Sequence, residues 1–567
     1  MKYFLCITIS LLLGATAFSQ QGGLRDLTNE EFVGYLEAFD LGTLDDAAIE
    51  LLGGPGDKCG FELTAEIIRR RSTFSPSQLE KVESFLAPPE LQVSITSPSG
   101  LFTINYDRSG SNAAALLDES GNRINGTADQ YAAEVAKYFD EAYQVEVDEI
   151  GYEPPPGQPY VINIVEHGSG IYGITKTSTA LPGQSACRKW RTYIDIDNDF
   201  RGYYSSGLEG ARVTAAHEFH HMVQLGGYGF CENESWFYEM TSTYYEERIY
   251  EETNDYWQYM KEYFNSPEQS IYYWPGYQVA HFPMVMKKEH NDDVLRRSWE
   301  YIRDFRPDRA PDPFSAMEFG LVPESSDLAT LLCKWARYNY LTDYRTYDAP
   351  PDHRYDDGGD LPLIRFAGSQ EIVAGTAIFN GNLSPISMTF FEAFFEQDTV
   401  VFAVTNTDVE SASDNATRGN FTSFRLDVSR FDPGGDAVKL SNGWYYKFVG
   451  NENNTLCLNV FVNKALQDPG ITSAYPNPFD PARDSYIRFP IPVSTPQTTT
   501  DLGIFTIGMD LVYSQESSTI YRDERFGAFA QWNGQTNSGE SAASGVYYYS
   551  LTHGGETTVG KFAIIRR

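Results

Sequence analysis

Basic residues are scarce in this sequence compared with acidic ones. Lysine and arginine together number 43 against 78 aspartates and glutamates, which gives a formal net charge of −35, and no run of basic residues stands out. An anionic surface of this size repels phosphate groups. We therefore expect neither nucleic acid nor an acidic membrane as a partner.

Long apolar runs are also missing. The apolar stretch at residues 4–13 follows Lys2, ends before a group of small residues at 15–19, and is too short to cross a bilayer. This pattern predicts a secretory signal peptide at residues 1–19. We expect a secreted or cell-surface protein with no transmembrane span.

Cysteines are few, and no two form a C-x-x-C pair, which argues against a cysteine-ligated zinc site or a redox dithiol. Cys6 lies in the predicted signal peptide, so an odd number remains. Export permits a disulfide, and Cys187 with Cys231 is the candidate because they flank residues 217–221. The alternative is that all are buried as small apolar residues. The remaining cysteines are Cys59, Cys187, Cys231, Cys333 and Cys457.

The length of 567 residues and an apolar fraction of 41% predict several domains with real cores. Residues 20–90 have a helical pattern and form either a propeptide or a packed subdomain. Residues 91–345 are expected to be α+β. After a linker rich in Asp, Pro and Gly at 344–360, short β runs predict a β-sandwich at 361–465 and an immunoglobulin-like β domain at 468–567.

Within the α+β region, Phe102, Ile104 and Tyr106 alternate with polar residues, as expected for a half-buried strand. A helix is predicted at 129–143, followed by strands at 160–166 and 192–197. Another helix, carrying His217, follows these strands. An aromatic-rich helix is expected at 236–250.

The motif H-E-x-x-H occurs as His217, Glu218 and His221. Residues four apart lie on one helix face, so the two imidazoles can bind one zinc ion. Glu218 lies about 100° around the helix from His217, close enough to act on a water at that metal. His220 points away from this face and is expected to pack or to be solvated.

A catalytic zinc has three protein ligands and an open position. Glu239, eighteen positions after His221, is the candidate third ligand, and Glu234 competes with it. Glu246 lies on the same helical face as Glu239 and is either an acceptor that holds a ligand or a solvated charge. Candidates for transition-state stabilisation are Tyr277 and His281.

Residues 118–129 form an acidic loop with oxygen-bearing side chains at the spacing of a calcium site. The candidate ligands are Asp118, Ser120, Asn122 and Asp129. Against calcium, Arg123 stands where such loops need glycine, and Asp129 can instead cap the following helix.

With these residues the chain resembles the gluzincins, secreted and cell-surface zinc peptidases whose third ligand is a glutamate on the next helix. The resemblance covers residues 90–345 and implies a zincin-like fold, with zinc on His217, His221 and Glu239 and Glu218 as the general base. A closer likeness is to bacterial metalloproteases in which an H-E-F-x-H helix is followed by W-x-x-E-x-T. The chain departs from the gluzincin pattern at Met240, where glycine is usual.

The C-terminal region has a second resemblance. An Asn-Pro turn at Asn477, an Asn-Gly turn at Asn533, the aromatic run 547–549 and a basic end at 561–567 resemble the sorting domain of type IX secretion. This likeness implies the outer-membrane secretion machinery as a partner. An ordinary accessory β domain is the alternative.

Together these observations predict a secreted zinc endopeptidase acting on protein or peptide substrates. The alternative is a non-catalytic surface protein or adhesin, in which a degenerate peptidase-like domain binds protein or glycan. Zinc is the expected cofactor, with calcium as a possible second ion.

Overall fold

The computed structural model describes most of the chain: residues 23–42, 58–167, 171–182, 187–231, 235–304, 312–346, 349–372, 376–395, 398–409, 422–430, 444–450, 455–464, 474–482, 484–491, 499–523, 527–553 and 556–566. The predicted signal peptide, residues 1–19, lies outside this range. The chain divides into two compact units, Met1–Glu392 with Phe402–Val460 and Ala393–Val401 with Phe461–Arg567.

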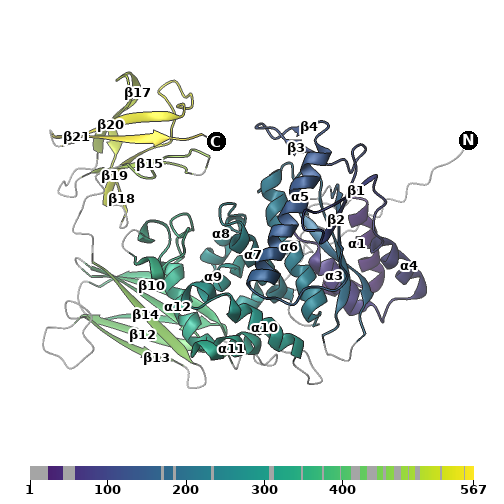
Figure 1. The fold of residues 1–567 in the computed structure, drawn as a ribbon. Helices are drawn as coiled ribbons and strands as arrows, with labels where there is room; N and C mark the ends of the chain where they lie inside the picture. Colours follow the sequence, from purple (N-terminus) through teal and green to yellow (C-terminus); the bar gives the residue numbers. More distant parts are fainter. Residues whose placement is uncertain are drawn as a thin grey trace, which may run out of the picture. The chain divides into compact units, whose positions relative to one another are not determined.

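The N-terminal region is helical, as its pattern predicts. It comprises η1 (Leu24–Asp26), α1 (Asn29–Asp40), α3 (Phe61–Arg70) and α4 (Pro76–Phe85), coloured purple in Figure 1. Thr28 and Ser75 form capping boxes that fix the starts of α1 and α4. The buried side chains of these helices share one core with Ile171 and Ile174. The helical region is thus packed against the sheet described next.

A five-stranded sheet follows, in the order β1-β2-β5-β7-β6. Its strands are β1 (Val93–Thr96), β2 (Phe102–Tyr106), β5 (Tyr160–Val165), β6 (Gly173–Ala180) and β7 (Trp190–Asp197). β2, β5 and β7 are parallel, whereas β1 and β6 are antiparallel edge strands. The sequence pattern predicts β2, β5 and β7 but misses both edges. A small hairpin, β3 (Leu116–Leu117) and β4 (Arg123–Ile124), lies between β2 and the first covering helix.

Three helices cover and extend the sheet. α5 (Ala128–Tyr143) packs on β2, and α6 (Leu208–Val223) packs on β6, β7 and α5. α7 (Ser235–Ile249) packs on α6 in turn. The rings of Phe102 and Phe219 lie 5.7 Å apart, so the apolar side of α6 meets the sheet and leaves its other side to face α7. Short π turns, η2 (Gln144–Glu149) and η3 (Gln224–Tyr228), end α5 and α6.

More helices complete the α-rich part of this unit. They are α8 (Trp257–Asn265), α9 (His281–Glu289), α10 (Asp293–Asp304), α11 (Pro313–Leu321) and α12 (Leu328–Tyr340), with short turns η4 (Ile271–Tyr273), η5 (Tyr277–Val279), η6 (Val322–Glu324), η7 (Asp343–Thr346) and η8 (Pro351–His353). Within the described ranges, none of the helices has the length and apolar content needed to cross a membrane.

β-structure follows α12. One sheet has the order β14-β11-β10-β8 and the other β13-β12-β9. The strands are β8 (Gly368–Glu371), β9 (Thr376–Leu383), β10 (Ser387–Phe395), β11 (Asp398–Asn406), β12 (Thr422–Arg430), β13 (Trp444–Val449) and β14 (Leu456–Lys464). Phe391 contacts Phe379 and Phe424 across the sheets. A disulfide joins Cys333 of α12 to Cys457 of β14.

The C-terminal unit also contains two sheets, ordered β15-β19-β18 and β17-β16-β20-β21. The strands are β15 (Ile487–Ile491), β16 (Thr499–Thr506), β17 (Leu511–Thr519), β18 (Tyr521–Asp523), β19 (Gly527–Trp532), β20 (Gly545–His553) and β21 (Glu556–Ile564). Both sheets contribute to one core around Phe489, Trp532 and Tyr549. The chain is therefore a mixed α/β region followed by several β-sheets, as the sequence predicts.

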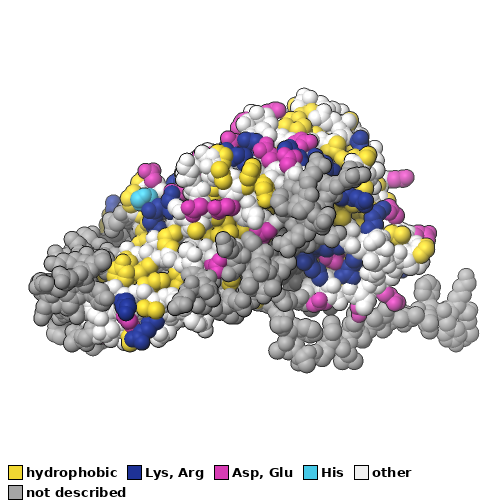
Figure 2. All heavy atoms as spheres, turned by 90° about the horizontal axis from the view of Figure 1, so that it is seen from below, with side chains coloured by type: hydrophobic (Ala, Val, Ile, Leu, Met, Phe, Trp, Pro, Cys, Tyr) yellow, Lys and Arg dark blue, Asp and Glu magenta, His cyan; other side chains and the backbone are white. Residues whose placement is uncertain are grey.

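One face of the molecule shows how the charged side chains are distributed. On the face in Figure 2, lysines and arginines form several small groups with aspartates and glutamates beside them.

Candidate metal centre

Helix α6 places His217, Glu218 and His221 in its buried C-terminal half. The imidazoles at i and i+4 share one face, and their Nε2 atoms lie 3.1 Å apart. Phe219 points to the opposite side, into the aromatic core against the sheet. Packing on the sheet therefore holds the two imidazoles in place.

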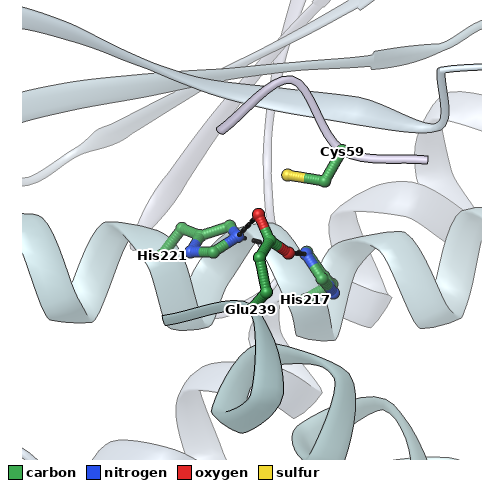
Figure 3. Close-up of side chains that lie close together, drawn as sticks. All are labelled: Cys59, His217, His221 and Glu239. Carbon is green, nitrogen blue, oxygen red and sulfur yellow. Dashed lines mark hydrogen bonds and ion pairs between the residues drawn. The ribbon is translucent and has the colours of Figure 1, made fainter. Parts of the chain in front are cut away.

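Helix α7 brings Glu239 to the same point. Its Oε2 lies 3.2 Å from Nε2 of His217, and its Oε1 lies 3.6 Å from Nε2 of His221 (Figure 3). Gly276, which precedes η5, lies against α7 at Glu239. It has a φ of 134°, and a Cβ on it would lie 2.5 Å from Cβ of Glu239. The absence of a side chain at this position lets η5 approach α7 closely.

The outer nitrogens of both histidines are bound by acceptors. Nδ1 of His217 lies 2.6 Å from Oε1 of Glu246, and Nδ1 of His221 lies 2.8 Å from Oε1 of Gln224. Because the amide of Gln224 donates to the carbonyl of Tyr238, its oxygen must face His221. These acceptors assign a proton to each Nδ1, so each Nε2 is the atom that can offer a lone pair to a metal ion. At His217 the metal ion would replace the proton that the imidazole otherwise holds at Nε2, beside Glu239.

The electrostatics of the site also favour a cation. Burial lowers the pKa of His217, but its hydrogen bonds with Glu239 and Glu246 outweigh burial and raise the pKa to about 10. Burial raises the pKa of Glu239, but His221 and His217 outweigh that effect and lower the pKa to about 2. The two glutamates therefore stabilise positive charge at the imidazole of His217.

Cys59 completes the group. Single donor atoms of Cys59, His217, His221 and Glu239 all lie within 4.8 Å of one another, and all four residues are buried. In Figure 3 the thiol enters from the side opposite to Glu239. The sequence argues against a cysteine-ligated zinc site because no C-x-x-C pair occurs, and it does not reveal that Cys59 lies beside these histidines. The sequence distance from Cys59 to His217 hides the contact, because spacing rules detect only ligands that are close along the chain.

Glu218 lies beside this group and is bound at both oxygens. The Sγ of Cys59 lies 3.1 Å from Oε1, and the hydroxyl of Thr175 donates to Oε2 at 2.7 Å. Gly173 on β6 makes this approach possible, because a Cβ there would lie 2.9 Å from Cγ of Glu218.

Other predicted residues take different places. Glu246 contacts His217, as expected for an acceptor that holds a ligand. The ring of Tyr277 stacks beside His217 at 6.0 Å, whereas His281 packs against Tyr263 and other aromatic side chains. His220 faces away from the centre, with Nδ1 2.7 Å from Oε2 of Glu146.

Two of the residues predicted to bind calcium, Asp118 and Asp129, form hydrogen bonds with different parts of the protein. Asp118 accepts the backbone N–H groups of Ser120 and Asn122, which closes a turn. Asp129 instead binds the guanidinium of Arg108 and the hydroxyl of Tyr106. Thr127, and not Asp129, is the residue that precedes α5. The calcium site stays a prediction.

Two further sequence predictions concern this region. The disulfide between Cys187 and Cys231 is confirmed. Glu234, the competing third ligand, lies outside the described residues.

Comparisons with known proteins assign no family to this chain. No family model matches the sequence, and no curated protein matches it. One matching solved structure is from a study of PorZ, described as an essential bacterial surface component of the type IX secretion system of Porphyromonas gingivalis. The match has 22% identity and a TM-score of 0.14 and covers 18% of this chain and 13% of that one. A superposition of that quality establishes neither fold nor function.

Proposed function

We propose that this chain is a secreted, zinc-dependent peptidase with a zincin-like catalytic region. The observation that carries the proposal is the convergence of His217, His221 and Glu239, with the outer nitrogen of each histidine already bound by an acceptor. Glu218 lies next to this group, which supports the role of general base that we propose for it.

The donor atoms fit zinc. Imidazole nitrogen, carboxylate oxygen and thiolate sulfur are its usual ligands, and two histidines with one glutamate form a set used in catalytic sites. Zinc held by three protein ligands polarises a carbonyl and lowers the pKa of a water to about 7.

The residues of the chain supply the proton transfers. The hydroxyl of Thr175 donates to Oε2 of Glu218, which leaves Oε1 directed at the centre. In the proposed reaction, this carboxylate takes the proton of the attacking water and passes it to the leaving amine. Glu246 holds the ring of His217 in the tautomer that a ligand requires.

Export is the other part of the proposal. Residues 468–567 resemble a type IX sorting domain, and the two-sheet architecture of the C-terminal unit is compatible with that role. The partner would be the outer-membrane secretion machinery. The protein would then act on protein or peptide substrates outside the cell.

One observation favours a different function. With Cys59 the centre has four protein donors, and a closed set of four is typical of structural zinc. In that case the chain would be a non-catalytic surface protein whose peptidase-like region binds protein or glycan.

Zinc content and cleavage of casein test the peptidase proposal. Because Cys59 offers a fourth donor atom, cleavage is measured with the Cys59→Ala chain, and the matched control is the Cys59→Ala/Glu218→Gln chain. We expect about one zinc per chain in both and cleavage only in the first. Equal cleavage by both chains, or purified protein without zinc, would overturn the proposal.

The third ligand has its own test. Glu239→Ala is expected to lose zinc during dialysis against a chelator, whereas Glu234→Ala is expected to keep it. The reverse result would transfer the ligand role to Glu234.

A further inference from the structure

Residues 58–61 of the N-terminal region occupy the centre of the proposed active site. Cys59 brings its sulfur within 4.8 Å of the donor atoms of His217, His221 and Glu239. The same sulfur lies 3.1 Å from Oε1 of Glu218 and so contacts the proposed general base as well as the group of proposed ligands. An attacking water would have to lie within reach of the same groups. The thiol and the water therefore exclude each other.

Lys58 anchors the segment from one side. Its ammonium lies 2.5 Å from Oε2 of Glu246 and also pairs with Asp255, and all three side chains are buried. Burial lowers the pKa of Lys58, but the charges of Asp255 and Glu246 outweigh it and hold the pKa above its ordinary range. The segment is thus bound by a charged pair to the carboxylate that holds His217.

Phe61 anchors the segment from the other side. Its ring stacks on the imidazole of His221 at 4.2 Å, with 6° between the planes. Its N–H also approaches the sulfur of Cys59 at 3.3 Å. Both histidines of the centre are therefore in contact with this segment, directly or through Glu246.

The main chain of the segment covers the outer edge of β6. The N–H of Gly60 donates to the carbonyl of Gly173 at 2.9 Å, and the N–H of Tyr172 donates to the carbonyl of Lys58 at 2.7 Å. Farther along, the hydroxyl of Thr64 donates to the carbonyl of Thr175. An exposed strand edge is a binding place for an extended peptide. Here the chain itself takes that place.

Gly60 allows this close approach. A Cβ at this position would lie 2.6 Å from the side chain of Ile174, which is fully buried. A larger residue would push the segment away from β6 and withdraw the sulfur from the centre.

We propose that Cys59 is a fourth, displaceable ligand of the metal and that residues 58–61 keep the peptidase latent. On ligation the thiol would pass its proton to Oε1 of Glu218, to which it already donates at 3.1 Å, and the thiolate would fill the position that catalysis needs. Withdrawal of the segment opens this position and the edge of β6 together, so the substrate is an extended peptide laid along β6. The latency of the peptidase rests on the proposed function. The assignment of Cys59 as a metal ligand does not.

The ligand is tested without any activity measurement. The full chain is loaded with Co²⁺, and its near-ultraviolet absorption is recorded for wild type and Cys59→Ala. We expect a thiolate-to-cobalt charge-transfer band in the wild type and none in the variant, with Co²⁺ bound in both. A wild-type spectrum without that band would overturn the ligand assignment.

Latency is tested by casein cleavage with the full chain loaded with zinc. Cys59→Ala and Gly60→Ala are expected to cleave about tenfold faster than wild type or more, because both open the fourth position. Gly34→Ala is the matched control, since a Cβ at Gly34 in α1 meets nothing within 4 Å. Its rate should equal that of wild type.

The outcomes separate the two proposals. Equal rates in wild type, Cys59→Ala and Gly60→Ala would overturn latency and leave the peptidase intact. The charge-transfer band together with zinc-loaded but inactive variants would overturn the peptidase and leave Cys59 as a structural ligand.

Discussion

Nδ1 of His217 lies 2.6 Å from Oε1 of Glu246, and the other oxygen of that carboxylate lies 2.5 Å from Nζ of Lys58. One buried carboxylate thus joins the metal centre to the N-terminal segment that covers it. Glu246 orients a ligand and at the same time binds the segment that carries Cys59. Disturbing this residue should affect both the metal and the segment.

We expect Glu246→Ala to weaken zinc binding by about 10- to 100-fold, because the acceptor that fixes the tautomer of His217 is lost. Competition with a chromophoric chelator measures this affinity. Glu252→Ala is the control, since Glu252 is exposed and pairs with Arg212 at the surface. An unchanged affinity in Glu246→Ala would contradict the role given to this carboxylate.

Gly276→Ala should displace α7 at Glu239. The position has a φ of 134°, and the added Cβ would lie 2.5 Å from Cβ of Glu239 and 2.6 Å from the carbonyl of Trp236. We expect weaker zinc binding in the same competition assay. Gly121→Ala shares a positive φ but meets nothing within 4 Å, so it should lose no zinc affinity. Equal affinities in the two variants would refute the contact argument.

His281 should make stability depend on pH. Burial lowers its pKa to about 3 from an ordinary value of 6.5. Because the unfolded chain binds the proton more tightly, the contribution of His281 is fully present above about pH 6.5 and is lost as the pH falls toward 3. Between pH 6.5 and pH 5 this loss amounts to about 1.5 kcal/mol.

Urea unfolding of wild type and His281→Phe at both pH values measures this effect. Phenylalanine does not titrate, so the variant should lose about 1.5 kcal/mol less than wild type on acidification. The comparison of differences removes any change in packing that is independent of pH. Parallel losses in both proteins would show that His281 is not held neutral by burial.

The sequence predicts the part of the site that is local in the chain. His217, Glu218 and His221 lie within two turns of one helix, and Glu239 and Glu246 lie two turns apart on the next, so helical periodicity places them. Periodicity also predicts β2, β5 and β7, because each strand places isoleucine in the core, although Asn163, Asp195 and Asp197 are buried beside them. The same pattern does not predict β6, because the residues of Gly173–Ala180 are mostly small and polar even where they are buried.

Cys59 could not be predicted for a related reason. It reaches the centre only because residues 58–60 pair with the start of β6, the edge strand that the sequence pattern misses. The one available signal was the odd number of cysteines left after export. That count says that a thiol remains outside disulfides, but not where the fold places it. Likewise, periodicity cannot tell that Tyr277 lies beside His217 and His281 does not.

X-ray absorption at the zinc edge of the full wild-type chain tests the central claim most directly, because it reports the atoms bound to the metal. The account predicts one sulfur at about 2.3 Å and three nitrogen or oxygen ligands, and it predicts loss of the sulfur in Cys59→Ala. Four nitrogen or oxygen ligands and no sulfur in the wild type would contradict it.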